Sequence, residues 1–484
     1  MVTMTAAALS GLLWLGGFGL HPIPVLTWLA PVPLLLLGVP KKALTATLVA
    51  WPIGQLAMAG YYLRTLRIPL PVVIGFVIYG TALAAGTVLL AGGLLRRGRT
   101  VTAVLAVPAL WVLGEYLVSV LMPNGAWWSL AYTQAGVRPV IQLTSLTGVW
   151  GVSYLLIAVP IALAALLTRP KAAVACLLVL AVSAGGWATW SLNRRPGAGE
   201  RLAVGLVALE QPEDGMALDA APDLLTRYLA RAESLAARGA TIVVLPEKVF
   251  GVGSRKELED AFRPVTDRGV QVIVGAVLTE GDTRRNVAFV LGGTGRTYTK
   301  QHLIRGLEDW FTAGDQDLVV GRRGVAVCKD LDFPGLVRRY RARGATMLLV
   351  PALDFGGDGW LHSRMAVVRG VESGMTVVRA ADFGRLTVSD ATGRVLGEVT
   401  TGDAELLVTV TPGVVGTVYG RTGDWFVMLA LVLFPVALWP VRDRFRRGGS
   451  ERRRRSAGLP RRGRLFPGAM GEDPRVGQGT GRGR

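Results

Sequence analysis

Cysteine and charged residues are both scarce in this chain of 484 residues. Its only cysteines are Cys176 and Cys328, which excludes a disulfide framework as the organising device of the fold. Charged residues make up 18% of the chain and apolar residues 51%, whereas an ordinary soluble domain is about one-quarter charged. This balance excludes an intrinsically disordered protein and disfavours a purely soluble one.

The formal net charge of +19 is concentrated at the C-terminal end. Residues 442–484 hold 14 arginines and 4 acidic residues. A segment rich in arginine and glycine cannot bury a core. We therefore expect a disordered tail that lies against anionic membrane lipid, and we expect no nucleic-acid partner.

Long apolar runs fill the N-terminal part. A membrane-spanning helix needs about 20 mostly apolar residues. We expect a membrane domain of about seven spans in residues 1–195 and a further span at 424–441. The seven apolar runs are 4–20, 23–40, 43–63, 70–94, 101–122, 144–168 and 172–192. A signal peptide at the first run is disfavoured, because no basic residue precedes it and further spans follow.

Basic residues in the connecting segments predict how the chain is oriented in the membrane. If the N-terminus is cytoplasmic, the basic clusters at 41–42, 96–99 and 169–171 lie inside, together with the tail at 442–484. Only scattered arginines then lie outside. This orientation places residues 196–423 on the extracytoplasmic face of the membrane.

Residues 196–423 have a different pattern, in which short β-rich runs alternate with helical patterns. We expect strands at 202–209, 241–245, 271–278, 286–291, 324–327, 346–350 and 375–380, and helices at 219–238, 334–343 and 360–373. Alternating strands and helices indicate an α/β domain whose sheets are covered by helices. The segment is long enough for one substantial core.

Three polar residues stand at strand ends in this domain: Glu247 after residues 242–246, Lys300 after 296–299 and Cys328 after 325–327. Strand ends on a rigid sheet are common catalytic positions. A thiolate is a strong nucleophile, a carboxylate can accept its proton, and an ammonium can stabilise a developing oxyanion. Each residue also has an ordinary structural interpretation: a buried small side chain for the cysteine, a loop carboxylate, and a solvated surface lysine.

The segments around these residues resemble the Glu-Lys-Cys motifs of the nitrilase superfamily. They are Leu245-Pro246-Glu247, Tyr298-Thr299-Lys300-Gln301-His302-Leu303 and Val327-Cys328-Lys329-Asp330. A nitrilase-type domain between seven N-terminal spans and one C-terminal span resembles the apolipoprotein N-acyltransferase family, as do the segments 144–153 and 419–425. The resemblance covers nearly all of residues 1–441.

The resemblance implies a multi-span α-helical membrane domain plus an α/β nitrilase-like αββα sandwich. It also implies two-step acyl transfer through Cys328, from a phospholipid donor to a diacylglyceryl lipoprotein acceptor. Glu247 would act as general base and acid, and Lys300 would stabilise the oxyanion. Glu308 and Asp330 are the expected supporting carboxylates. No metal or organic cofactor is implied.

Two departures from the family leave alternatives open. The usual Cys-Tyr-Glu reads Cys328-Lys329-Asp330, and we expect Lys329 to be an exposed cation that attracts anionic lipid. The interval between Lys300 and Cys328 is short, so most of the arm that covers the family's active site is missing. A membrane-anchored nitrilase-type amidase that hydrolyses a C–N bond is one alternative, and a non-catalytic scaffold relative is another.

Overall fold

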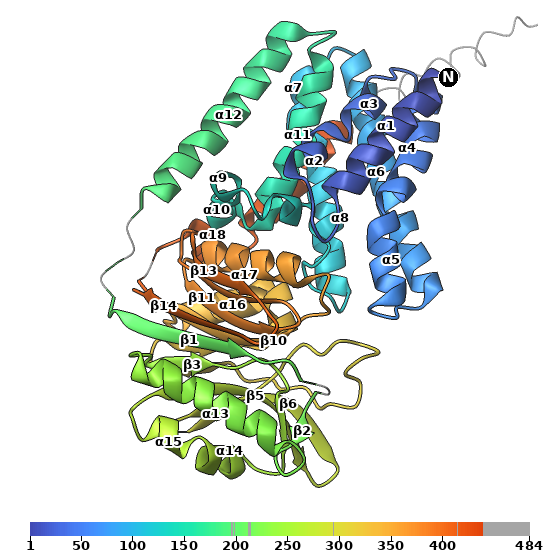
Figure 1. The fold of residues 1–484 in the computed structure, drawn as a ribbon. Coiled ribbons are helices and arrows are strands. Elements are labelled where there is room, and N and C mark those ends of the chain that lie inside the picture. Colours follow the sequence, from blue (N-terminus) through green and yellow to red (C-terminus); the bar gives the residue numbers. More distant parts are fainter. Residues whose placement is uncertain (195–196, 198, 212–213, 294, 414, 439–484) are drawn as a thin grey trace, which may run out of the picture. The chain divides into compact units, whose positions relative to one another are not determined.

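The computed structural model describes residues 1–438, apart from 195–196, 198, 212–213, 294 and 414. The arginine-rich tail at 442–484 therefore lies outside the described residues, as does the end of the expected C-terminal span. The described residues form an N-terminal helical part followed by an α/β domain (Figure 1).

Three helices of the N-terminal part are long and apolar enough to cross a membrane. They are α6 (Leu70–Arg96), the helix Thr100–Leu121 formed by α7 (Thr100–Ala106) and α8 (Pro108–Leu121), and α12 (Pro170–Leu192). Two further candidates are bent pairs of helices. One is α4 (Pro40–Gly54) with α5 (Leu56–Arg64), bent by 42°, and the other is Arg138–Thr147 with α11 (Val149–Ala165), bent by 118°.

The remaining apolar runs form shorter helices. These are α1 (Val2–Gly17), the segment Pro24–Leu35 that contains α2 (Pro24–Leu29) and α3 (Val32–Leu35), and Trp425–Leu438. The sharp bend before α11 depends on Gly148, whose φ of 66° favours glycine. A Cβ at this position would also lie 2.6 Å from the Tyr419 ring. The number of spans in a bilayer stays a prediction.

A buried carboxylate organises the loop that follows α8. Glu115 accepts hydrogen bonds from four neutral donors and is 4% exposed. The donors are Trp111 Nε1 (2.8 Å), Leu130 N (2.7 Å), Ser129 Oγ (3.0 Å) and Ser153 Oγ (2.7 Å). Because Ser129 and Leu130 begin the short helix η1 (Leu130–Gln134), Glu115 fixes the end of the loop at 123–128.

The α/β domain contains two sheets. The first has the strand order β14-β1-β3-β5-β4-β2, with β6 beside β5 and β7 beside β6, and the second has the order β13-β12-β11-β10-β9-β8. The strands of the first sheet are β1 (Leu202–Ala208), β2 (Met216–Ala217), β3 (Ile242–Val244), β4 (Phe250–Val252), β5 (Gln271–Glu280), β6 (Thr283–Leu291), β7 (Arg296–Thr299) and β14 (Ala404–Val410). Those of the second are β8 (Leu318–Val320), β9 (Arg323–Val325), β10 (Met347–Leu353), β11 (Thr376–Asp382), β12 (Arg385–Ser389) and β13 (Val395–Thr400).

Helices cover both sheets, which gives the expected αββα sandwich (Figure 1). The helices α13 (Pro222–Ala237), α14 (Arg255–Ala261) and α15 (Arg263–Thr266) share a core with the first sheet, while α16 (Pro334–Ala342) and α17 (Gly359–Ser373) pack with the second. The central strands β1, β3 and β5 are parallel and buried on both faces, which explains their continuous apolar runs. All seven expected strands and all three expected helices are confirmed, with ends shifted by a few residues.

Candidate active site

Three of the residues predicted from the sequence meet in one buried cluster. Lys300 follows β7, and its Nζ lies 2.7 Å from Glu247 Oε1 and 2.9 Å from Glu308 Oε2. None of the three side chains is more than 2% exposed. Glu247 follows β3, whose end approaches β5 so closely that a Cβ at Gly275 would lie 2.5 Å from Glu247 Cα. The sheet therefore fixes where this carboxylate stands.

Asn286 is a fourth member of the cluster and was not among the residues predicted from the sequence. Its Nδ2 donates to Glu247 Oε1 at 2.6 Å and to Glu308 Oε1 at 2.9 Å. The residue lies in β6 and is fully buried. The only sign of it in the sequence is that Asn286 is the one polar residue in the apolar run 286–291. Asn286 bridges the two carboxylates that hold Lys300.

Cys328 is the first residue of the turn η2 (Cys328–Asp332), and two residues separate it from the end of β9 at Val325. Its φ of 43° lies in the left-handed region, which is uncommon for a residue with a side chain and is often found at functional sites. The thiol is 7% exposed, and Sγ lies 3.4 Å from the carbonyl oxygen of Leu353 at the end of β10.

The surrounding charges couple Cys328 to the cluster. Burial raises the pKa of the Cys328 thiol well above its usual value, and the negative charge of Glu247 raises it further, while Lys300 opposes both. Burial lowers the pKa of Lys300, but Glu247 and Glu308 outweigh this effect and hold it well above normal. Burial raises the pKa of Glu308, but Lys300 and Lys248 make the net shift downward. In the resting protein the Cys328 thiol is therefore protonated and Lys300 is an ion-paired ammonium.

Asp330 is buried but supports the turn and not the Lys300 cluster. It accepts hydrogen bonds from the Tyr298 hydroxyl at 2.7 Å, from Val327 N at 3.1 Å and from His302 N at 3.0 Å. The His302 ring stacks on Phe333 with centroids 3.5 Å apart. Asp330 thus ties the segment after Lys300 to the turn that carries Cys328.

The prediction that Lys329 is exposed is wrong. Its side chain extends away from solvent, and the residue is only 7% exposed. The Nζ atom donates to Asn124 Oδ1 at 3.0 Å and to the Leu303 carbonyl oxygen at 3.2 Å. Burial lowers the pKa of this ammonium. Isolated lysines are mostly found on the surface, and the contact with residue 124 could not be read from the sequence.

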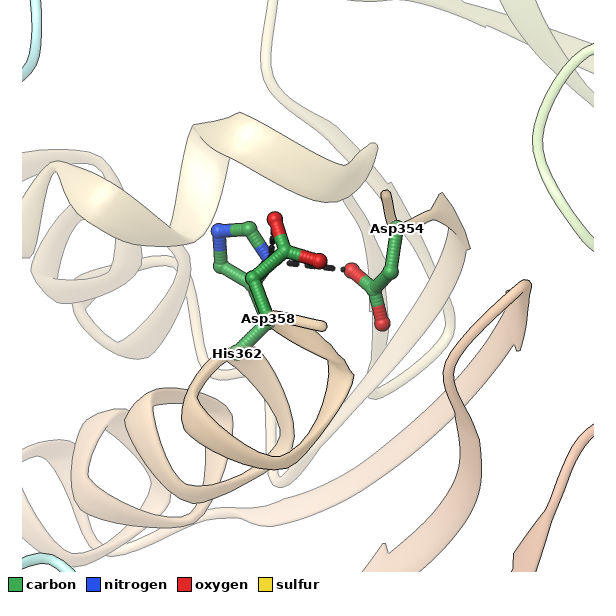
Figure 2. A group of neighbouring side chains, drawn as sticks. All are labelled: Asp354, Asp358 and His362. Carbon is green, nitrogen blue, oxygen red and sulfur yellow. Dashed lines mark ion pairs between the residues drawn. The ribbon is translucent and has the colours of Figure 1, made fainter. Parts of the chain in front are cut away.

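A second buried group of charges lies beside the end of β10. Arg379 donates to both oxygens of Asp354 at 2.8 and 2.5 Å. The His362 ring lies beside both Asp354 and Asp358 (Figure 2), with Nδ1 3.0 Å and 3.4 Å from their respective carboxylate oxygens. Asp358 also accepts hydrogen bonds from Phe355 N and from the hydroxyl of Tyr61 on α5.

This second group has the spacing of a metal site but is already paired. The ligand atoms of Asp354, Asp358 and His362 lie within 4.8 Å of one another. The Arg379 guanidinium occupies both Asp354 oxygens, however, and its positive charge opposes the binding of a second cation. We therefore interpret the group as an ion-pair network.

Comparisons with known proteins agree with this arrangement. Residues 10–162 match the family model of the apolipoprotein N-acyltransferase N-terminal domain, and residues 204–415 match that of the carbon-nitrogen hydrolases. An apolipoprotein N-acyltransferase from Geobacter metallireducens is 27% identical, over 87% of this chain and 91% of its own. One from Gloeobacter violaceus is 28% identical, over 84% and 88%.

Shorter relatives match the α/β domain. A hydrolase from Mycobacterium tuberculosis is 31% identical over 36% of this chain and 71% of its own length. The crystal structure of an amidase from Nesterenkonia sp. superposes with a TM-score of 0.39 at 23% identity, covering 49% of this chain and 98% of its own. The two family models together span both parts of the molecule, and the chain belongs to the apolipoprotein N-acyltransferase family within the nitrilase superfamily of carbon-nitrogen hydrolases.

Proposed function

We propose that the protein transfers a fatty acyl chain from a phospholipid to the α-amino group of the diacylglyceryl-cysteine at lipoprotein N-termini. The names of its full-length relatives support this reaction. The observation that carries the assignment to these residues is Lys300 held between Glu247 and Glu308, with the charges of Glu247 and Lys300 acting on the Cys328 thiol.

The first step forms a thioester. Because burial and Glu247 keep the resting thiol protonated, Glu247 takes the proton as Sγ attacks the ester carbonyl carbon of the donor. Lys300 offers its positive charge to the oxyanion that develops. The carbon–oxygen bond then breaks, Glu247 returns the proton to the departing alkoxide, and a lysophospholipid leaves.

The second step transfers the acyl chain to nitrogen. The neutral α-amine of the lipoprotein attacks the thioester carbonyl carbon, and Glu247 accepts the proton that the nitrogen loses. The carbon–sulfur bond breaks, an amide forms, and the thiolate regains its proton from Glu247. Lys300 and Glu308 remain paired in both steps, so no net charge needs to enter or leave the buried cluster.

Mass spectrometry of lipoprotein N-termini tests this function. Cells that contain the protein should carry an N-acylated diacylglyceryl-cysteine, and cells without it should carry a free α-amine. Cells that produce the Cys328→Ser variant, which should keep the fold, are the matched control. Their lipoproteins should keep a free α-amine. Acylated N-termini in cells that lack the protein and any related enzyme would contradict the proposal.

Amide hydrolysis is the second candidate, and the match to a mycobacterial hydrolase at 31% identity favours it. A hydrolase and a transferase both form an acyl-enzyme, but they differ in what removes the acyl group. An acyl-enzyme that water clears as fast in the presence of a diacylated lipopeptide as in its absence would identify a hydrolase. A protein that forms no acyl-enzyme would be a scaffold.

The proposed topology places residues 196–423 outside the cell and the tail inside. Both proposed substrates lie in the outer leaflet, and the basic loops agree with that orientation. Single cysteines at Ser254 and Ser456, in a background without native cysteines, test it on intact cells. An impermeant thiol reagent should label position 254 and not position 456, and the reverse pattern would invert the topology.

A further inference from the structure

The turn that carries the nucleophile is held by two segments from different parts of the chain. One is the loop at 123–128, which follows the membrane helix α8. The other is the segment directly after Lys300, in which the His302 ring stacks on Phe333. Both segments therefore pack against the residues that immediately follow Cys328.

The loop at 123–128 approaches the turn through its backbone. Ala126 N donates to the Asp332 carbonyl oxygen at 2.8 Å. Gly125 has a φ of 53°, and a Cβ there would lie only 2.4 Å from the same oxygen. Trp127 packs its ring on that of His362, with centroids 4.7 Å apart. The loop is thus seated closely on the turn and on α17.

Lys329 is the side chain that contacts both segments. Its ammonium donates at 3.0 Å to Asn124 Oδ1 in the loop and at 3.2 Å to the Leu303 carbonyl oxygen in the other segment. Both acceptors are uncharged, so the interaction does not neutralise the lysine as an ion pair would. Burying an ammonium in this way is unfavourable unless its hydrogen bonds are made.

We propose that Lys329 is a positioning residue that fastens the loop at 123–128 and the segment after Lys300 over the nucleophile turn, and so keeps water from the acyl-enzyme. The inference rests on the proposed function. The short interval between Lys300 and Cys328 lacks the arm that covers the active site in the family, and these two segments would take its place. One of them belongs to the membrane domain, and the hydrogen bonds of Lys329 hold both of them.

The test measures the lifetime of the acyl-enzyme. A p-nitrophenyl ester of a long-chain fatty acid loads Cys328 without any phospholipid, and the loaded protein is then diluted into buffer. Lys329→Met, which is one atom shorter, unbranched and without donors, should form the acyl-enzyme within about threefold of the wild-type rate. It should lose the acyl group to water about ten times faster, in proportion to one or two lost hydrogen bonds.

A double-mutant cycle distinguishes a specific contact between Lys329 and Asn124 from a general loss of stability. Asn124→Ala should accelerate hydrolysis by about threefold alone and should add nothing to Lys329→Met, because its contact acts through Lys329. Lys329→Arg keeps the charge and the donors and should restore a long-lived acyl-enzyme. Lys256→Met, on the exposed surface of α14, is the matched control and should behave as the wild type.

Two results would overturn the inference. One is an unchanged rate of thioester hydrolysis in Lys329→Met, and the other is strictly additive effects of Lys329→Met and Asn124→Ala. The proposed function is judged separately, by whether the loaded wild-type protein passes its acyl group to a diacylated lipopeptide. If the wild-type protein fails this transfer, the role of Lys329 can still be tested, because the hydrolysis rates are compared without any acceptor.

Discussion

Two buried groups of charges act on the Cys328 thiol, and they differ in how their charges are paired. In the first, the ammonium of Lys300 faces the carboxylates of Glu247 and Glu308, and Lys248 Nζ lies 3.8 Å from Glu308. In the second, Arg379 binds both oxygens of Asp354, and His362 lies between Asp354 and Asp358. In the first group, Glu308 keeps Lys300 and Lys248 as partners when Glu247 takes up a proton. In the second, Arg379 occupies both oxygens of Asp354, so neither side chain can change charge without losing its partner.

This difference suits the two groups to different roles. A side chain that exchanges protons during a reaction must be able to change its charge without breaking the contacts of its neighbours. Glu247 meets this condition, because Lys300 remains paired with Glu308 when Glu247 is protonated. A paired arginine and aspartate lose their mutual stabilisation when either changes charge. The second group also accepts a hydrogen bond from Tyr61 on α5. We therefore expect mutations in the first group to affect rate and those in the second to affect stability.

Removing the nucleophile should have the largest effect. Serine is nearly the size of cysteine, but its hydroxyl stays protonated where a thiol can ionise. Cys328→Ser should lower acyl transfer by at least about a thousandfold and leave the unfolding temperature nearly unchanged. Cys176→Ser, in α12, is the control and should keep full activity. Activity in Cys328→Ser equal to the wild type would reject the thioester mechanism.

The two groups can be compared directly through one isosteric substitution in each. Glu247→Gln should slow acyl-enzyme formation by about 10²- to 10⁴-fold, the usual value of general acid–base catalysis. Its effect on stability should be small, because Lys300 still faces Glu308 at 2.9 Å. Single-turnover loading with a labelled phospholipid measures the rate.

Asp354→Asn should show the opposite pattern. It removes the charge that faces Arg379 and should lower the free energy of unfolding by about 3–5 kcal/mol, because a buried guanidinium is left without its partner. The folded fraction should load Cys328 at a rate much closer to the wild type. Thermal unfolding in detergent measures the stability, and a rate loss in Asp354→Asn as large as that in Glu247→Gln would remove the distinction between the groups.

Asn286 allows a finer test of the first group. Asn286→Ala removes the donor shared by Glu247 and Glu308, while both carboxylate oxygens keep their hydrogen bond from Lys300 Nζ at 2.7 and 3.1 Å. Glu247 is then held by Lys300 without its second donor. We expect acyl-enzyme formation to fall by about tenfold to a hundredfold. Asn286→Asp should be worse, since a third carboxylate would enter the cluster. A wild-type rate in Asn286→Ala would show that Lys300 alone positions Glu247.

The parts of the fold that the sequence predicted share a local signal. The strands β3 and β5 are continuous apolar runs, and α13 begins and ends close to its expected limits. The strands β12 to β14 were not expected, because two of them are only half-buried and their runs contain Gly397, Glu398 and Glu405. Such strands depend on pairing with their neighbours, which no local pattern reveals.

The candidate site divides in the same way. Glu247, Lys300 and Cys328 could be selected because polar residues after apolar strands stand out and because their motifs resemble a known family. Asn124 and Tyr61 could not, since each meets its partner across more than 200 residues of sequence. Contacts of this kind follow from how the membrane domain packs against the α/β domain, and neither periodicity nor spacing encodes that packing in a readable form.

The smallest predicted effect is a pH dependence of the second group. Burial lowers the pKa of His362, but the carboxylates of Asp358 and Asp354 outweigh it and make the net shift upward. A group whose pKa is higher in the folded protein stabilises it fully below its unfolded pKa of about 6.5. That stabilisation is lost as the pH rises through the folded pKa. Asp354 has a lowered pKa, so its contribution is lost only in acid, as the pH falls below about 4.

The variant His362→Gln should therefore be less stable than the wild type at pH 6, and the difference in unfolding temperature should shrink as the pH rises above 6.5. Glutamine is polar but uncharged, so what the comparison removes is the charge. The loss of stability below about pH 4 should remain in the variant, because Arg379 contributes more than His362 to the lowered pKa of Asp354. Unfolding temperatures between pH 5 and pH 9 decide the matter. A constant difference over this range would mean that His362 is neutral and only packs against Trp127.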